Sequence, residues 1–206
     1  MASDPNSILN KLFSTNHRVL LERNLASDLK QCRGTTLVIG AGYDPYRKLL
    51  MNTEKIITSD IDPTLKNIDI LCDADSIPLP DTSIDSIVSI EVFEHIKDLD
   101  RCLEECVRLL KPNGILYFTM PVMFHIHADP VDYRRLTKHG AEALVPEAFV
   151  IQSMRYYGSL LNVVCDLISS ASLGARVLRP LFRVATIFTR TSEVFPSGLI
   201  VVARKK

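Results

Sequence analysis

The sequence predicts an α/β fold, in which a doubly wound and mostly parallel sheet of seven strands carries helices on both faces. Short apolar runs rich in β-branched residues alternate with segments of helical spacing. The strand-like runs are apolar along their whole length, as expected when both faces of a sheet are covered. The first three runs end at Gly40, Asp60 and Asp73, which places turn-forming and polar residues where each strand stops.

The length of 206 residues suits one α/β domain with a substantial core and is short for two. We therefore interpret residues 1–206 as a single domain, with an N-terminal helical segment at 1–33 and an apolar and basic helical insertion at 158–192 before the last strand. Lysine plus arginine number 24 and aspartate plus glutamate number 24, so the net charge is zero. This balance gives no reason to expect a nucleic-acid partner.

The five cysteines form no CxxC pair. Cys102 and Cys106 share one face of an expected helix, but no histidine lies near them in sequence, and we predict no metal site. Reduced thiols in the core are the expected state, which suits a cytoplasmic protein. We also expect neither a signal peptide nor a membrane-spanning helix, because no sufficiently long apolar run is present.

The elements follow in order along the chain. Apolar residues between 5 and 31 recur at helical spacing, with a break near 14–16. Residues 44–51 are expected to form a helix with Pro45 in its first turn, and 99–110 an amphipathic helix closed by 111–114. The strands are expected at 35–39, 55–59, 68–72, 86–90, 114–120, 148–154 and 199–203. This alternation predicts a Rossmann-like arrangement.

Doubly wound sheets bind their ligands at the carboxyl ends of the strands. Gly40-Ala41-Gly42 follows the first strand, and glycines there allow a tight turn and close approach of a ligand to the backbone. Asp60 follows the second strand, where a carboxylate can accept hydrogen bonds from both hydroxyls of a ribose. Asp62 is an alternative for this role, and capping of the next helix is the simpler interpretation of either aspartate.

The segment 73–85 follows the third strand and suits an adenine pocket. Asp73 can accept a hydrogen bond from the exocyclic amine, the Ala74 amide can donate to a ring nitrogen, and Ile77 can pack on the ring.

Five segments, in this order, resemble the motifs of class I S-adenosylmethionine-dependent methyltransferases, most closely the type 11 small-molecule group. They are Gly40-Ala41-Gly42, Ser59-Asp60-Ile61-Asp62, the stretch 73–85, Glu91-Val92-Phe93-Glu94-His95 and Leu109-Leu110-Lys111-Pro112-Asn113-Gly114. The resemblance runs from about residue 35 to 155. It implies methyl transfer by in-line displacement, with S-adenosylmethionine as cofactor. The cofactor-binding residues that it implies are Gly40, Ala41, Gly42, Asp60, Ile61, Asp73, Ala74 and Glu91.

The sequence departs from the family pattern in the glycine loop. Val38 stands where the family usually has an acidic residue, and Asp44 lies near the place of a third glycine. The methionine amino group must therefore find another partner, such as the loop backbone or a group near Glu91. The stretches 45–50 and 127–137 look like a subgroup often associated with surface glycans or lipid-linked sugars, which implies a glycan or lipid-linked acceptor.

The loop after the fifth strand concentrates polar side chains and is the expected acceptor side. A hydroxyl or ammonium acceptor must lose a proton, so His125 and His127 are candidate bases, whereas a carboxylate acceptor needs none. The candidate substrate contacts are Asp129, Tyr133, Arg134 and Arg135. Solvent-facing histidines and surface salt bridges are the simpler alternatives. We expect His95 to fix the loop after the fourth strand rather than to take a proton.

The stretch 158–190 holds one acidic residue, Asp166, and four arginines. If the segment is helical, Arg176, Arg179 and Arg183 share a face, while Pro180 should break or start a helix. Three interpretations stay open: a core-packing element or homodimer surface, a lid over the substrate, and a peripheral membrane contact near a lipid-linked acceptor.

Two other functions compete with methyl transfer. An NAD-type oxidoreductase would also use a glycine turn and Asp60, but the loop lacks the third glycine and the segment 73–85 would have no role. A non-catalytic S-adenosylmethionine-binding or scaffold protein is the other alternative, because a fold does not imply an activity and Val38 replaces the usual acid.

Overall fold

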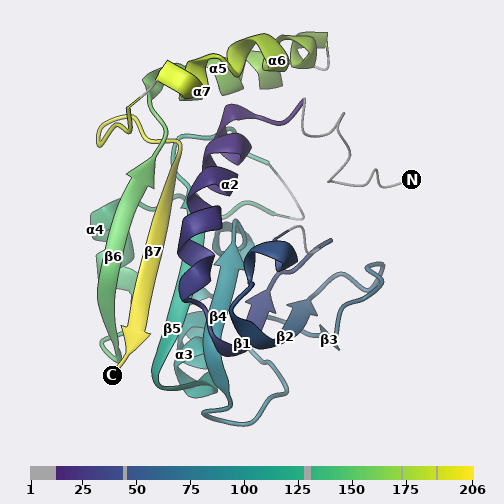
Figure 1. Ribbon diagram of the computed structural model, residues 1–206, viewed down its shortest axis with the longest axis vertical. Coiled ribbons are helices and arrows are strands. Elements are labelled where there is room, and N and C mark those ends of the chain that lie inside the picture. The colour runs from purple at the N-terminus through teal and green to yellow at the C-terminus, as the bar shows by residue number, and fades with distance from the viewer. Residues whose placement is uncertain (1–12, 44–45, 128–130, 173, 189) are drawn as a thin grey trace.

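The computed structural model describes residues 13–43, 46–127, 131–172, 174–188 and 190–206. Within them one sheet has the strand order β3-β2-β1-β4-β5-β7-β6 (Figure 1). The strands are β1 Gly34–Ile39, β2 Thr53–Asp60, β3 Ile70–Leu71, β4 Ile84–Ile90, β5 Leu110–Pro121, β6 Phe149–Tyr157 and β7 Gly198–Lys205. Strands β1 to β5 pair in parallel, while β7 runs antiparallel to both β5 and β6. The predicted seven-stranded, mostly parallel sheet is confirmed.

Helices cover both faces of this sheet, as predicted, and the last ones lie across one end of it. In Figure 1, α2 crosses in front of the sheet, whereas α3 and α4 lie behind it. Helices α5, α6 and α7 lie across the end toward which β1, β2 and β4 point. The helices are α2 Asn16–Asp28, α3 Leu99–Leu109, α4 Lys138–Leu144, α5 Leu160–Ser170, α6 Arg179–Phe182 and α7 Ala185–Phe188. Short 3-10 turns are η1 Leu29–Gln31, η2 Arg47–Leu49, η3 Phe93–His95 and η4 Gly174–Leu178.

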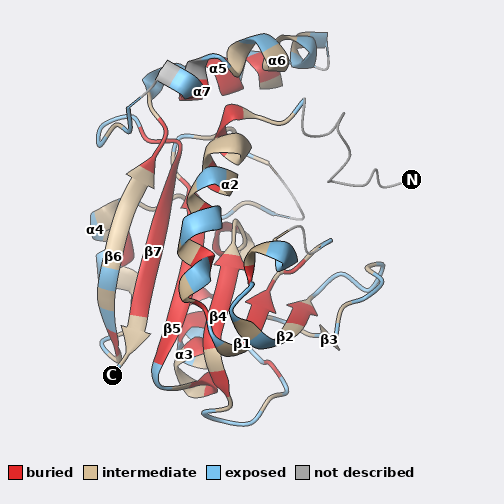
Figure 2. Ribbon diagram, in the orientation of Figure 1, coloured by how far each residue is buried: buried red, intermediate tan, exposed pale blue. Residues whose placement is uncertain are grey.

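Two apolar layers hold the helices to the sheet. Leu21, Leu25 and Leu29 of the N-terminal segment pack against one face, together with Val88 and Tyr117. The apolar stripe of α3 packs against the other face (Figure 2). All five cysteines are unpaired, and four of them are buried, which agrees with the expected reduced core thiols.

Two expected elements differ from the structure. The helix predicted at 44–51 is a single 3-10 turn, η2, in the described part of the segment. Since β2 already begins at Thr53, the chain has room for no more than one turn. The segment 111–114, expected to close the helix, lies inside β5. There the register between β4 and β5 shifts, and Asn113 takes a positive φ of 66°. The expected turn is therefore present as an irregularity within the strand.

The insertion holds the N-terminal end of α2. Both carboxylate oxygens of Asp166, on α5, accept hydrogen bonds from the backbone amides of Asn16 and His17, each at 2.7 Å. These are amides that the first turn of a helix leaves unpaired. Pro180 lies in the first turn of α6, which agrees with its expected role as a helix start. None of the described helices has the length and apolar character needed to cross a membrane.

Candidate active site

A cavity of about 400 Å³ opens where β1 and β4 end, and α2 forms its other wall. Its position at the carboxyl ends of the parallel strands is the one expected for a ligand site in a doubly wound sheet. The lining residues are Thr15, His17, Arg18, Leu21, Val38, Ile39, Gly40, Ala41, Gly42, Tyr43, Tyr46, Ile90, Glu91 and Phe124.

The glycine loop needs both of its glycines. Gly40 and Gly42 have φ values of 63° and 54°, which L-residues with side chains rarely adopt. A Cβ on Gly40 would lie 2.5 Å from Cγ2 of Val92, so a side chain does not fit there. Gly42 has no atom within 4 Å of the same position, and its backbone faces open space. The loop therefore offers a ligand bare backbone at the cavity wall.

Asp60 lies next to this loop, at the end of β2. One of its carboxylate oxygens accepts a hydrogen bond from the Gly42 amide at 2.8 Å, and the other accepts one from the Asp62 amide at 3.0 Å. Ile61 beside it is 59% exposed, an unusual position for a large apolar side chain and one suited to covering a flat ligand. The Asp62 carboxylate accepts a hydrogen bond from the Thr64 amide, which lowers its pKa.

The residues predicted to form an adenine pocket lie in different surroundings. Asp73 follows β3 and is exposed, and Ala74 is half-buried and packs against the core. The prediction for Ile77 is wrong: its side chain is buried inside the core cluster, and its amide donates a hydrogen bond to Glu105 at 2.7 Å. Ile77 therefore holds the segment to α3 and presents no face to a ligand.

Glu91 is the acidic residue of the cavity wall, where Val38 supplies only apolar surface. Its φ of 55° is a left-handed conformation that costs a non-glycine residue on the order of 1–3 kcal/mol. Thr119 fixes it, because its hydroxyl donates to the Glu91 carboxylate at 2.9 Å and its carbonyl accepts from the Glu91 amide at 3.2 Å. Strained backbone that is held this firmly is typical of functional sites.

His17 completes the wall, and no pattern in the sequence singled it out. Its side chain is buried, and Nε2 lies 2.7 Å from the Glu91 carboxylate and 3.0 Å from the Tyr157 hydroxyl. Its ring also packs on that of Phe124, with centroids 4.6 Å apart. The contact joins α2 to the end of β4 across 74 residues of sequence. This separation explains why only the fold could bring the pair together.

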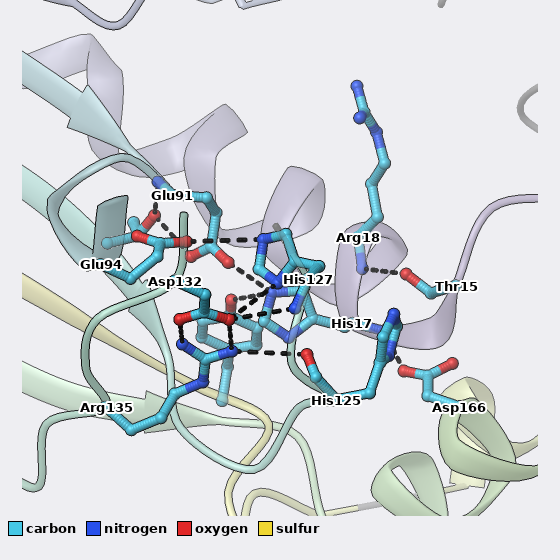
Figure 3. A network of polar contacts seen from close by, with 12 residues as sticks. Thr15, His17, Arg18, Glu91, Glu94, His125, His127, Asp132, Arg135 and Asp166 are labelled. Carbon is cyan, nitrogen blue, oxygen red and sulfur yellow. Dashed lines mark hydrogen bonds and ion pairs between the residues drawn. The ribbon is translucent and has the colours of Figure 1, made fainter. Parts of the chain in front are cut away.

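The two predicted histidine bases occupy different surroundings (Figure 3). His125 packs on Phe124, with ring centroids 4.2 Å apart, and its Nδ1 is buried without a hydrogen-bond partner. His127 lies further along the loop, with Nδ1 3.5 Å from the Asp132 carboxylate. Burial lowers the pKa of both imidazoles, so both are neutral at pH 7. Among the loop residues that the structure describes, only Phe124 lines the cavity itself.

The other predicted acceptor contacts serve the loop's own structure. Both terminal nitrogens of Arg135 donate to the Asp132 carboxylate. This is the salt bridge that was the simpler alternative to a substrate contact. Arg134 donates to the Lys97 carbonyl at 2.6 Å. The amide of Tyr133, whose ring is exposed, donates to the Glu94 carbonyl at 2.9 Å. Asp129 lies outside the described residues.

His95 ties the end of β4 to this loop, as expected, because its Nδ1 donates to the Val131 carbonyl at 2.6 Å. Beside it Glu94 is fully buried, and neither carboxylate oxygen has a hydrogen-bond partner in the described part of the chain. Burial, reinforced by the charge of Glu91, raises the pKa of Glu94 to about 9. No prediction from the sequence covered this residue.

Part of the chain is similar to known methyltransferases. Residues 37–118 match the family model described as "Methyltransferase domain". A relative named "Probable S-adenosylmethionine-dependent methyltransferase", from Mycobacterium tuberculosis, is 42% identical over 45 residues, which are 22% of this chain and 16% of that protein. The chain thus spans less than a fifth of the length of the curated relatives it matches.

Solved structures share the fold along nearly the whole chain. The (4+2)-cyclase SpnF has a TM-score of 0.64 at 19% identity, covering 99% of this chain and 84% of its own. Phosphoethanolamine N-methyltransferase 2 of Haemonchus contortus, solved with phosphomonomethylethanolamine and S-adenosylhomocysteine, has a TM-score of 0.58 at 15% identity. That match covers 92% of this chain and 52% of the other.

Residues 37–118 thus match a methyltransferase domain, and the strand-end motifs and the shared fold are similar to those of class I S-adenosylmethionine-dependent methyltransferases. The cofactor of this class is S-adenosylmethionine. The named relatives support a methyltransferase and give no support to the NAD-type alternative.

Proposed function

We propose that the chain binds S-adenosylmethionine in the cavity beside the glycine loop and transfers its methyl group to a small-molecule acceptor. The observation that carries the proposal is the cavity itself, which bare loop backbone and a strained Glu91 line at the strand ends, with the Asp60 carboxylate bonded to the loop at Gly42. When bound, the cofactor supplies a methyl group on a positively charged sulfur. Alignment of acceptor and methyl group is then the protein's main contribution to the rate.

Each part of the cofactor has a partner in this proposal. Asp60 would accept hydrogen bonds from the ribose hydroxyls, and Ile61 would cover the adenine that Asp73 and the Ala74 amide recognise. Glu91 would replace the acid missing at Val38 and receive the methionine amino group. Two observations support this role for Glu91. Its carboxylate lies on the cavity wall, and among the basic side chains described there it contacts only His17.

The carboxylate end of the cofactor would meet the first turn of α2. Thr15 and Arg18 line the cavity there, and the Arg18 guanidinium is a cation that can pair with a carboxylate. Arg18 lies over the Tyr46 ring, with its guanidinium carbon 5.9 Å from the ring centroid.

The acceptor would approach along Phe124, with His125 as the base where the acceptor must lose a proton. His125 is the better placed of the two predicted bases, because its ring lies closer to that of the cavity-lining Phe124, with centroids 4.2 Å apart against 5.7 Å for His127. Its lowered pKa keeps the imidazole neutral and able to accept a proton at pH 7. His127 instead faces Glu94 and Asp132.

A methyl-transfer assay tests the proposal. Purified chain is incubated with methyl-labelled S-adenosylmethionine and a panel of hydroxyl, amine and carboxylate acceptors, and release of S-adenosylhomocysteine is measured. We expect His125→Ala to lower turnover of a hydroxyl acceptor by about a hundredfold or more while cofactor affinity stays constant. Equal turnover in this variant and the wild type would show that His125 is not the base.

The exposed face of the insertion at 158–192 favours a lipid-linked acceptor. Large apolar side chains on α5 and α6 are exposed, and residues 167–192 contain arginines but no acidic residue, which complements an anionic lipid surface. The exposed residues include Leu160, Leu161, Val164, Leu167, Ile168 and Leu181. We propose that this face rests on the membrane surface.

Sedimentation with vesicles tests this membrane contact. The wild type should bind phosphatidylglycerol vesicles more strongly than phosphatidylcholine vesicles, and Leu167→Glu should abolish binding. Val150→Glu, which changes an exposed apolar residue on β6, is the matched control and should bind normally. Absence of vesicle binding, with a dimer in light scattering that Leu167→Glu dissociates, would assign the face to a homodimer instead.

A further inference from the structure

A second cluster of polar side chains lies behind the cavity, where η3 meets the loop after β5. Glu94 and His95 come from η3, and His127 comes from the loop. Figure 3 shows Glu94 and His127. The carboxylate Oε1 of Glu94 lies 3.7 Å from Nε2 of His95 and 3.9 Å from Nε2 of His127. One ligand atom from each of the three residues lies within 4.8 Å of the others.

The burial of the Glu94 carboxylate indicates that it binds a ligand. Its side chain is 0% exposed, and both oxygens lack a hydrogen bond within the described residues. Buried carboxylates are almost always paired, hydrogen-bonded or bound to a metal ion. The imidazole nitrogens of His95 and His127 lie 3.7 and 3.9 Å from it, each too distant for a hydrogen bond but well placed to share an ion.

A hydrogen bond orients the His95 imidazole toward this carboxylate. Its Nδ1 donates to the Val131 carbonyl at 2.6 Å, which leaves the Nε2 lone pair free on the Glu94 side. Asp132 accepts a hydrogen bond from the His127 amide at 3.1 Å and lies 3.5 Å from Nδ1 of its ring, beyond hydrogen-bond reach, while Arg135 holds the Asp132 carboxylate. A carbonyl or carboxylate behind the ring is the usual support of a metal-binding histidine.

We infer that Glu94, His95 and His127 form a binding site for one divalent transition-metal ion of the zinc class, beside the cofactor cavity. Two histidines and one carboxylate are a ligand set used by zinc and by non-haem iron. Three protein ligands leave a fourth position of a tetrahedral ion open to water or to an acceptor atom. The inference does not depend on the proposed methyl transfer.

The two distances from Glu94 require little movement to close on an ion, whereas the two imidazole nitrogens, within 4.8 Å of each other, can need a larger shift. Metal–ligand distances near 2.0–2.1 Å put the ligand atoms of a tetrahedral site about 3.3 Å apart, only about half an ångström closer than the distances from Glu94. The imidazoles can supply that movement, because His95 and His127 keep 13% and 31% of their side chains exposed. Their exposure also gives an ion a path from solvent.

Titration calorimetry of the full chain, freed of metal by a chelator, tests the site. We expect one Zn²⁺ to bind per chain, and Mg²⁺, which prefers oxygen ligands, not to bind there. Glu94→Gln and His127→Ala should each weaken Zn²⁺ binding by more than about 100-fold, and Asp132→Asn by about 10–100-fold. His139→Ala, an exposed histidine on α4, is the matched control and should bind like the wild type.

A second readout separates metal binding from folding and from cofactor binding. Zn²⁺ should raise the melting temperature of the wild type but not that of Glu94→Gln, whose amide keeps the shape of the side chain. Co²⁺ should give the visible absorption of a tetrahedral site in the wild type alone. Failure of the wild type to bind Zn²⁺, or equal binding by Glu94→Gln, would overturn the inference. S-adenosylhomocysteine binding, measured on the same samples, reports on the proposed function separately.

Discussion

The contact between Asp166 and the start of α2 yields the most specific prediction about how the insertion serves the cavity. Asp166→Ala removes the acceptor of two buried backbone hydrogen bonds of 2.7 Å, to Asn16 and His17. Hydrogen bonds to a charged group contribute about 1.5–3 kcal/mol each to stability. The variant no longer has to bury a carboxylate, and this offsets part of the loss. The net loss of stability should therefore be about 2–4 kcal/mol. The pKa of Asp166 is raised by burial despite these bonds, which shows that the cost of burial is real.

Urea unfolding and calorimetry with S-adenosylhomocysteine measure the two consequences. Because α2 contributes Thr15, His17 and Arg18 to the cavity, the same substitution should weaken ligand binding about tenfold, equivalent to about 1.4 kcal/mol. Asp166→Asn keeps one acceptor oxygen and should lose roughly half as much stability. Leu167→Ala, an exposed position on the same helix, is the control. If Asp166→Ala matched this control in both measurements, the insertion would not be what positions α2.

Three further predictions follow from single residues. Gly40→Ala should abolish ligand binding and lower stability, measured by calorimetry and urea unfolding, because its Cβ would lie 2.5 Å from Val92 in a left-handed backbone. Asp73→Asn should weaken S-adenosylhomocysteine binding less than Asp73→Ala, since the amide keeps an acceptor, and a complex with Asp73 turned from the adenine would contradict its role. In chelator-treated protein, the contribution of Glu94 to stability should fall as pH rises from 6 to 8, because folding raises the pKa of Glu94 from 4.5 to about 9 and the folded chain alone holds that proton. Glu94→Gln should remove this part of the slope in urea unfolding, and an unchanged slope would contradict the raised pKa.

The parts of the site that lie at strand ends were predictable from the sequence. Gly40, Asp60 and Glu91 each follow an apolar run, and parallel strands bring their carboxyl ends to one edge of the sheet. The sheet order itself agrees with the alternation of strands and helices. The prediction for Ile77 failed because an apolar residue after a strand fits a core as well as a ligand, and only packing against α3 decides between them.

The parts of the site built by distant contacts were not predictable. His17 reaches Glu91 only because Asp166, 149 residues further along the chain, holds the first turn of α2. The Glu94 cluster likewise needs the loop after β5 to fold back, fixed by the bond from His95 to Val131. No periodicity or local motif encodes such pairings, since each depends on where a helix or loop settles on the finished sheet.

The most direct test of the central claim is calorimetry of the full chain with S-adenosylmethionine, S-adenosylhomocysteine and NAD. We predict that both sulfur compounds bind and NAD does not. Asp60→Ala should weaken their binding by about 1–3 kcal/mol, the scale for losing hydrogen bonds to a buried polar group, while Asp62→Ala should have little effect. Binding of NAD in preference to S-adenosylhomocysteine, or affinity unchanged in both aspartate variants, would contradict the account.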